Sequence, residues 1–180
     1  IVDNAGFELA SDLAFADLLL SGDWASEVRF HLKGHPTFVS DAVRKDVIDT
    51  ITRMQDRSVD HTSRLGSRLE GHLQHSRLTL WEDFFWNSPL DFWSLPEGLD
   101  DALAQADLLI SKGDANYRRL LGDRHWPYHT PFTEVVDYLP LPLLALRTLK
   151  AEVVVGLSRK VIKQTRQQDP DWMVNGRWGV

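Results

Sequence analysis

The sequence contains no cysteine among its 180 residues. This absence excludes a disulfide framework, a cysteine nucleophile and a thiolate metal site, and it weakly favours an intracellular protein. No apolar run approaches the roughly 20 residues that a membrane helix needs, so no membrane partner is expected. No basic region precedes an apolar run at the start, which argues against a signal peptide. We therefore expect a cytoplasmic protein, with the nucleus as an additional location.

An excess of positive charge and the best-known enzyme motifs are also missing. The net charge is -6, which does not favour binding along a nucleic-acid backbone, so no nucleic-acid partner is expected. The sequence has no G-x-S-x-G, no G-x-x-x-x-G-K-[ST] and no G-x-G-x-x-G, so serine hydrolases, P-loop enzymes and dinucleotide-binding enzymes lose their usual support. The histidines never occur in the zinc-hydrolase order H-E-x-x-H, and we interpret them as structural or surface residues.

Hydrophobic periodicity predicts an α/β fold. Helical spacing of apolar residues predicts a first helix over about 7–20 and another over 41–57, followed by a polar helical stretch over 58–80 and an irregular aromatic segment over 81–96. Strands are predicted over 27–32, 37–41 and 107–110, and a further strand ends near 147. A short helix is predicted over 115–121, a helix from about 151, and a turn and strand over 172–180. The recurring order of strand and helix predicts one catalytic domain over 1–180, a three-layer α/β/α sandwich with a mostly parallel, Rossmann-like sheet, helices on both faces and an irregular aromatic-rich insertion at about 58–100.

Polar side chains follow four predicted strand ends. We interpret Ile1 and Val2 as the last residues of a strand, and the polar groups are Asp3-Asn4, Asp41, Lys112 with Asp114, and Arg147-Thr148 with Lys150. The carboxyl ends of parallel strands meet at one edge of a sheet, so these groups can converge. Two carboxylates and an amide oxygen form a hard ligand set suited to Mg²⁺ or Mn²⁺. The neighbouring basic side chains, and the backbone N–H groups of the helix after Gly6, can bind a phosphoryl group.

Each of these four groups also has a simpler interpretation. Asp3-Asn4 before a glycine is a common turn signature, and Asp41 before a helix can be an N-terminal cap. The Lys112–Asp114 segment can be a turn and the Arg147–Lys150 segment a solvated helix start. Four separate strand ends with complementary charges are nevertheless less expected by chance than any one of them, which favours a phosphate site.

Several blocks of the sequence resemble one family, in the family's order. They are DNAGFEL, VRFHLKGHPTFVSD, SKGDANYRRLLGD, LALRTLKAE and VNGRWGV. Together they resemble the C-terminal catalytic part of the damage-control phosphatases, which are metal-dependent sugar-phosphate phosphatases also called acidic-residue methyltransferase-like (ARMT-like) proteins. The Arg147–Lys150 segment resembles the R-T-x-K signature of the subfamily that acts on fructose phosphates. Family members carry a helical N-terminal region ahead of the Asp-Asn block, so we expect this chain to be part of a longer protein with that region as its partner.

The resemblance implies a function, a cofactor and a set of site residues. The implied activity is hydrolysis of sugar phosphate monoesters such as fructose 1-phosphate and fructose 6-phosphate, with Mn²⁺, Co²⁺ or Ni²⁺, and Mg²⁺ as a further candidate. The implied metal ligands are Asp3, Asn4 and Asp41, and the implied catalytic residues are these three and Lys150. The implied substrate-binding residues are Asp3, Asn4, Lys112, Asp114, Arg147, Thr148, Lys150, Ala151 and Arg177, the last in place of the family's lysine.

Two rival functions remain open at the level of sequence. The family's second name implies an S-adenosylmethionine-dependent methyltransferase acting on protein glutamate carboxylates. No glycine-rich turn follows the first strand, and methyl transfer does not need a hard-metal ligand set. The other rival is a sugar-phosphate-binding module without turnover. Titration with S-adenosylmethionine or a sugar phosphate, and phosphate release with and without Mn²⁺, separate these functions.

Overall fold

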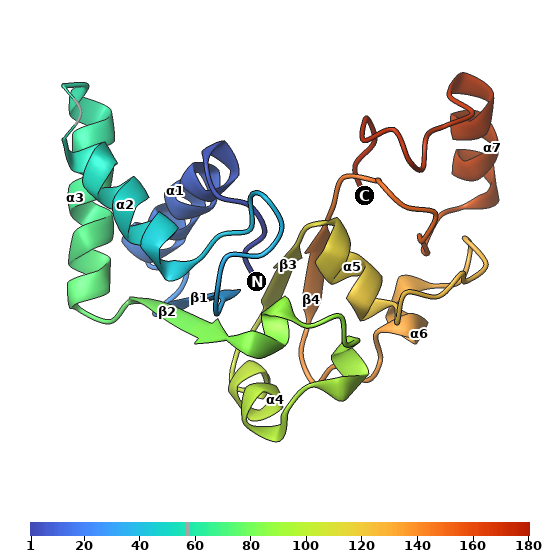
Figure 1. Cartoon of the computed structure of the whole chain (residues 1–180), viewed down its shortest axis with the longest axis horizontal. Helices are drawn as coiled ribbons and strands as arrows, with labels where there is room; N and C mark the ends of the chain where they lie inside the picture. Colours follow the sequence, from blue (N-terminus) through green and yellow to red (C-terminus); the bar gives the residue numbers. More distant parts are fainter. Residues whose placement is uncertain (57) are drawn as a thin grey trace. The chain divides into compact units, whose positions relative to one another are not determined.

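The computed structural model describes residues 1–56 and 58–180, which divide into two compact units, Ile1–Ser88 and Pro89–Val180. Each unit contains helices and one two-stranded parallel sheet (Figure 1). The mixed α/β class and the parallel strand pairing predicted from the sequence are therefore confirmed. A single domain over 1–180 stays a prediction, and the two units are described separately. Across the described residues, no helix is both long enough and apolar enough to cross a bilayer.

The first unit is built on a parallel strand pair with a two-helix crossover. Its elements are α1 (Phe7–Ser21), β1 (Val28–Lys33), α2 (Arg44–Gln55), α3 (Asp60–Gln74), β2 (Leu78–Asp83) and the 3-10 helix η1 (Phe84–Asn87). Val28 lies opposite Leu78, and Lys33 lies opposite Asp83. Helices α2 and α3 connect the two strands and pack against each other (Figure 1). The parallel register brings the carboxyl ends of β1 and β2 to the same edge.

Helix α1 anchors the core of the first unit. Its residues Leu9, Leu13 and Leu20 are fully buried, as their helical spacing predicts. They form one cluster with the apolar residues of β1, α2, α3 and β2, namely Phe30, Leu32, Val47, Ile51, Leu69 and Leu78. The predicted helix over 7–20 is confirmed, and so is the polar helical stretch that became α3.

Two expectations for the first unit are wrong. The predicted strand over 37–41 is a turn, in which Phe38 has a φ of 50°. Asp41 is not the cap of α2, because Val43 occupies that position and its backbone N–H donates to the Asp46 carboxylate at 2.9 Å. In addition, β2 is a regular strand where we expected the end of the polar helical stretch and the start of the irregular aromatic segment.

The second unit also contains a parallel pair, with a helix directly after its first strand. Its elements are η2 (Phe92–Ser94), α4 (Glu97–Ala104), β3 (Leu109–Lys112), α5 (Asp114–Leu120), α6 (Phe132–Val135), β4 (Leu143–Leu146) and α7 (Arg159–Gln168). Leu109 lies opposite Leu143, and Lys112 lies opposite Leu146. The strands β3 and β4 lie side by side next to α5 (Figure 1). The ends of β3 and β4 therefore place Asp114 and Arg147 next to each other.

The chain after β4 differs from its predicted form. Residues 147–149 continue in an extended conformation and pair with residues 178–180, through the antiparallel bridge of Thr148 and Gly179. The predicted helix from about 151 is wrong, since the next helix begins at Arg159, where the Ser158 hydroxyl caps it by accepting from the Val161 N–H at 3.2 Å. The carbonyl oxygens of Ala151 and Val153 accept from a guanidinium instead of from helical N–H groups.

Candidate active site

The backbone brings Asp3, Asn4 and Asp41 together in the first unit, and we call these three residues the Asp-Asn-Asp cluster. Asn4 and Asp41 form an antiparallel bridge. On either side of it, the Ala42 N–H donates to the Asp3 carbonyl at 2.9 Å and the Ala5 N–H donates to the Ser40 carbonyl at 2.7 Å. Gly6 then turns the chain into α1 with a φ of 76°, a conformation that favours glycine. Two segments distant in sequence thus meet directly before α1 and α2.

Side-chain hydrogen bonds connect the cluster to two residues that the sequence analysis did not identify. The Asn4 amide Nδ2 donates to Asp3 Oδ2 at 2.7 Å and to Glu8 Oε2 at 2.9 Å. The Ser40 hydroxyl donates to Asn4 Oδ1 at 2.6 Å. Glu8 is one helical turn beyond Asn4, and this spacing is the sequence signal that could have identified it. The amide nitrogen of Asn4 therefore lies between two carboxylates.

A buried lysine, also missed by the sequence analysis, holds the third member of the cluster. The Lys33 ammonium lies 3.3 Å from Asp41 Oδ2 and donates to the Trp86 carbonyl at 2.5 Å. The Lys33 and Asp41 side chains are only 4% and 8% exposed. Lys33 ends β1, whose last four residues are buried, and a lysine that directly continues a predicted strand is the signal that could have identified it. This contact fixes the orientation of one oxygen of Asp41.

The donor atoms of the cluster fit a hard divalent cation. Asp3 and Asp41 supply carboxylate oxygens, and Asn4 supplies an amide oxygen, which is the chemistry that Mg²⁺ and Mn²⁺ prefer. The position of the Asn4 nitrogen between the Asp3 and Glu8 carboxylates shows where positive charge is favourable. Among the described residues, no three His, Cys, Asp or Glu side chains are placed together so that they could hold a metal ion. The predicted set contains only two such residues, Asp3 and Asp41, because its third member is an asparagine. A cation held by the predicted set would take its third donor from Asn4, whose Oδ1 accepts from the Ser40 hydroxyl in this structure.

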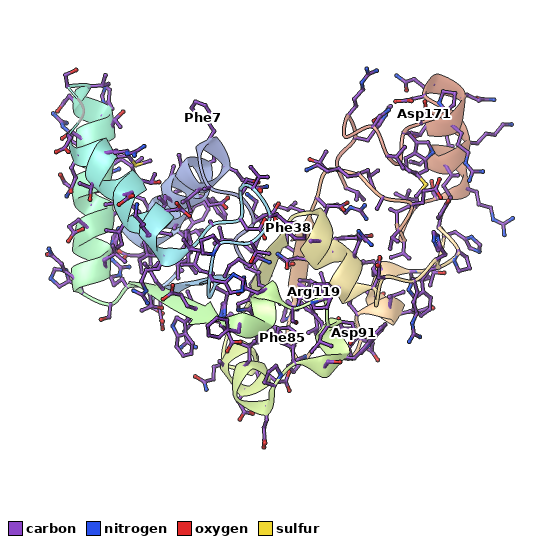
Figure 2. The ribbon with its side chains drawn as sticks, in the orientation of Figure 1. Phe7, Phe38, Phe85, Asp91, Arg119 and Asp171 are labelled. Carbon is purple, nitrogen blue, oxygen red and sulfur yellow. The ribbon has the colours of Figure 1, made fainter. Side chains whose placement is uncertain are left out.

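Exposed aromatic side chains flank the Asp-Asn-Asp cluster. Phe7, at the start of α1, is 96% exposed and points away from the ribbon (Figure 2). Phe38, two residues before Ser40, is 82% exposed. These rings lie outside the core of the first unit and add apolar surface near the cluster.

The second unit gathers the other predicted residues at the ends of β3 and β4. After Lys112, which is half-buried, Gly113 has a φ of 95° and starts the turn into α5, and its N–H donates to the Leu146 carbonyl at 2.9 Å. The Arg147 guanidinium then binds the Asp114 carboxylate, with Nη2 and Oδ1 2.6 Å apart. Burial lowers the pKa of Arg147, and the Asp114 charge opposes that shift. We call this pair the Arg147–Asp114 pair.

The remaining predicted residues lie in the same unit, on the segment after β4 and on the segment that pairs with it. Thr148 and Lys150 are exposed, and the Lys150 backbone N–H donates to Asp114 Oδ1 at 3.3 Å. The Ala151 carbonyl accepts from Arg147 Nη2 at 3.1 Å. Arg177 is exposed on the segment that pairs with 147–149, and its backbone N–H donates to Asn175 Oδ1 at 3.0 Å. The structure therefore assembles the predicted residues into one set in each unit, and the convergence of the two sets stays a prediction.

The fold and these residues define an α/β protein with an acidic, oxygen-rich cluster in one unit and a basic, anion-compatible segment in the other. Residues 1–164 match the family model of the damage-control phosphatase ARMT1-like domain, so the chain belongs to that family, as the resemblance indicates. It is 42% identical to damage-control phosphatase ARMT1 of Xenopus tropicalis and 36% identical to those of mouse and human, each over 184 aligned positions. All of this chain is covered, but it spans only 42% of the length of each of these relatives.

Proposed function

We propose that the protein hydrolyses sugar phosphate monoesters, such as fructose 1-phosphate and fructose 6-phosphate, with a divalent cation bound at the Asp-Asn-Asp cluster. Mn²⁺, Co²⁺ and Ni²⁺ are the preferred cations, and Mg²⁺ is a further candidate. The main support is the bridge between Asn4 and Asp41, which brings two distant segments of the sequence into one set of oxygen donors. The names of the relatives support the phosphatase class.

The proposal assigns each chemical task of the reaction to a named side chain. Asp3, Asn4 and Asp41 would hold the cation, and either aspartate could accept a proton from the attacking water. When bound, a divalent cation polarises a phosphoryl oxygen and lowers the pKa of water. The exposed ammonium of Lys150 would stabilise the negative charge that develops on the phosphoryl oxygens. Lys33 would hold Asp41 in its orientation, as partners outside the ligand set commonly do.

An Asp3→Ala variant of the full-length protein tests the proposal. Loss of one charged ligand should abolish Mn²⁺-dependent phosphate release from fructose 1-phosphate and weaken Mn²⁺ binding in calorimetry. Asp101→Ala changes an exposed aspartate of α4 and should leave both measurements unchanged. Normal turnover by Asp3→Ala would show that the site is wrongly assigned. Binding of the sugar phosphate by the unmodified protein without Mn²⁺-dependent release would instead identify a binding module.

A further inference from the structure

We propose that Arg147 is a positioning residue and not a ligand of the substrate phosphate. It would hold Asp114 and the backbone of 151–153 in place, so that Lys150 faces solvent as the anion-binding side chain. This inference rests on the proposed phosphatase function, and it divides the two positive charges of the Arg147–Lys150 segment between two different tasks.

The Arg147 side chain is enclosed by the second unit. Its exposed fraction is 0%. Nη1 donates to the Val153 carbonyl, and Nη2 donates to Asp114 Oδ1 at 2.6 Å and to the Ala151 carbonyl at 3.1 Å. The face of the guanidinium covers the ring of Tyr117, whose centroid is 4.5 Å from the guanidinium carbon. A phosphate would have to displace these partners to bind both ends of the guanidinium fork.

The backbone conformation explains why Arg147 and Lys150 differ in exposure. Arg147 and Leu149 form the backbone hydrogen bonds to residues 178–180, at 2.7 to 2.9 Å. In an extended chain, successive side chains point to opposite faces. Counted as whole residues with their backbone, Arg147 and Leu149 are 5% and 2% exposed, whereas Thr148 and Lys150 are exposed. The alternation places Thr148 and Lys150 on the outer face.

Asp114 connects the buried charge to the exposed one. Its Oδ1 atom accepts from Arg147 Nη2 and also from the backbone N–H of Lys150, at 3.3 Å. Arg147 thus fixes the carboxylate that in turn holds the backbone of Lys150. A ligand role for Arg147 has one observation in its favour, because its Nε atom is buried and has no hydrogen-bond partner within the described structure. This N–H group has no measurable contact with solvent, so a phosphate could reach it only after the surrounding chain opened.

Chemical labelling of the unmodified full-length protein tests the inference without any risk of misfolding. Phenylglyoxal modifies accessible arginines, and mass spectrometry measures the extent of reaction at each site. Arg159, exposed at the start of α7, should react readily, whereas Arg147 should react at least ten-fold more slowly until urea unfolds the protein. Inorganic phosphate should not change the rate at Arg147. Rapid labelling of Arg147 in the native protein, with protection by inorganic phosphate, would overturn the inference.

A pair of variants separates positioning from binding. Arg147→Lys keeps the charge but cannot contact Asp114, Ala151 and Val153 together, so it should lower the melting temperature by several degrees and change inhibition by inorganic phosphate less than three-fold. Lys150→Gln should leave the melting temperature within about one degree and weaken that inhibition at least ten-fold. An unchanged melting temperature of Arg147→Lys with ten-fold weaker inhibition would refute the positioning role. If the unmodified protein releases no phosphate with Mn²⁺, Co²⁺, Ni²⁺ or Mg²⁺, the proposed function is refuted. The labelling experiment would then still decide whether Arg147 is accessible to inorganic phosphate.

Discussion

Replacing Lys33 with methionine is the most informative test of the Asp-Asn-Asp cluster. The substitution preserves most of the side-chain volume but removes the charge beside Asp41, whose side chain is only 8% exposed. Breaking a buried ion pair from one side costs about 3–5 kcal/mol, because the remaining charge is left without a partner. The Trp86 carbonyl also loses its donor, at a cost of about 1 kcal/mol. We therefore expect Lys33→Met to lower the free energy of unfolding by about 3 kcal/mol at neutral pH.

Urea unfolding followed by tryptophan fluorescence measures this loss, since Trp86 is buried beside the altered site. Hydrogen exchange of β1 locates the loss within the first unit. Lys45→Met is a matched control, because Lys45 also pairs with an aspartate, Asp49, but both side chains are exposed. The control should leave the urea midpoint nearly unchanged.

Two further measurements connect the loss to charge. Adding Asp41→Asn to Lys33→Met removes the unpaired carboxylate and should restore at least half of the lost stability. Mn²⁺ should stabilise Lys33→Met more than it stabilises the unmodified protein, since the cation supplies the missing positive charge. A loss below about 1 kcal/mol in Lys33→Met, or no recovery in the double variant, would refute the argument that a buried charge pair fixes Asp41.

Two predictions concern the pH dependence of the first unit. Burial of His31 against the rings of Trp81 and Trp86 lowers the pKa of its imidazole from 6.5 to about 3. The unfolded chain therefore binds the additional proton, and stability should decrease as the pH falls from about 6.5 toward 3, by up to about 1.4 kcal/mol per pH unit. His31→Leu should flatten this dependence in urea titrations at several pH values, and an unchanged slope would contradict the prediction. Burial acts to raise the pKa of Asp17, but hydrogen bonds and charge from Arg68 outweigh it, and the net pKa lies below 3.8. Asp17→Asn should therefore lower the free energy of unfolding by about 2 kcal/mol at neutral pH. This difference from the unmodified protein should begin to decrease as the pH falls below 3.8, and it should be gone below the lower folded pKa of Asp17. A difference that persists at pH values below the folded pKa of Asp17 would show that packing, and not the carboxylate charge, accounts for the loss.

The elements predicted well from the sequence are those whose own side chains determine their conformation. Helix α1 has Leu9, Leu13 and Leu20 on one face, and its predicted and observed ends agree within one residue. Strand β1 was predicted one residue early, from the alternation of apolar and polar residues over 27–32. In both cases a local periodic pattern coincides with the face that the core covers.

The elements predicted wrongly depend on contacts that local patterns do not contain. Residues 37–41 have β-branched and aromatic side chains, but the backbone of Ser40 and of Ala42 just after them is hydrogen-bonded to residues 3–5. Residues 151–158 were predicted as helical, but Arg147 binds two of their carbonyl oxygens, and Gly156 has a φ of 79°. Tertiary contacts therefore override the local preference in both segments.

The same distinction separates the residues of the candidate site that sequence reasoning could find from those it could not. The general rule that polar groups gather at the carboxyl ends of strands identifies Asp3, Asn4 and Asp41, although in the structure an isolated bridge and not a strand end brings them together. Lys33 directly follows the strand predicted over 27–32, and only the observed contact with Asp41 shows why a charge is tolerated at this buried position. For Arg147 the motif identifies the residue, but the exposure of its guanidinium depends on Asp114, Tyr117 and Val153, which only the folded unit brings together. A sequence motif thus identifies the chemistry of a site but does not assign a role to each charged side chain. Side chains that bind a ligand and side chains that position other residues are of the same types, and they differ in how deeply the fold buries them.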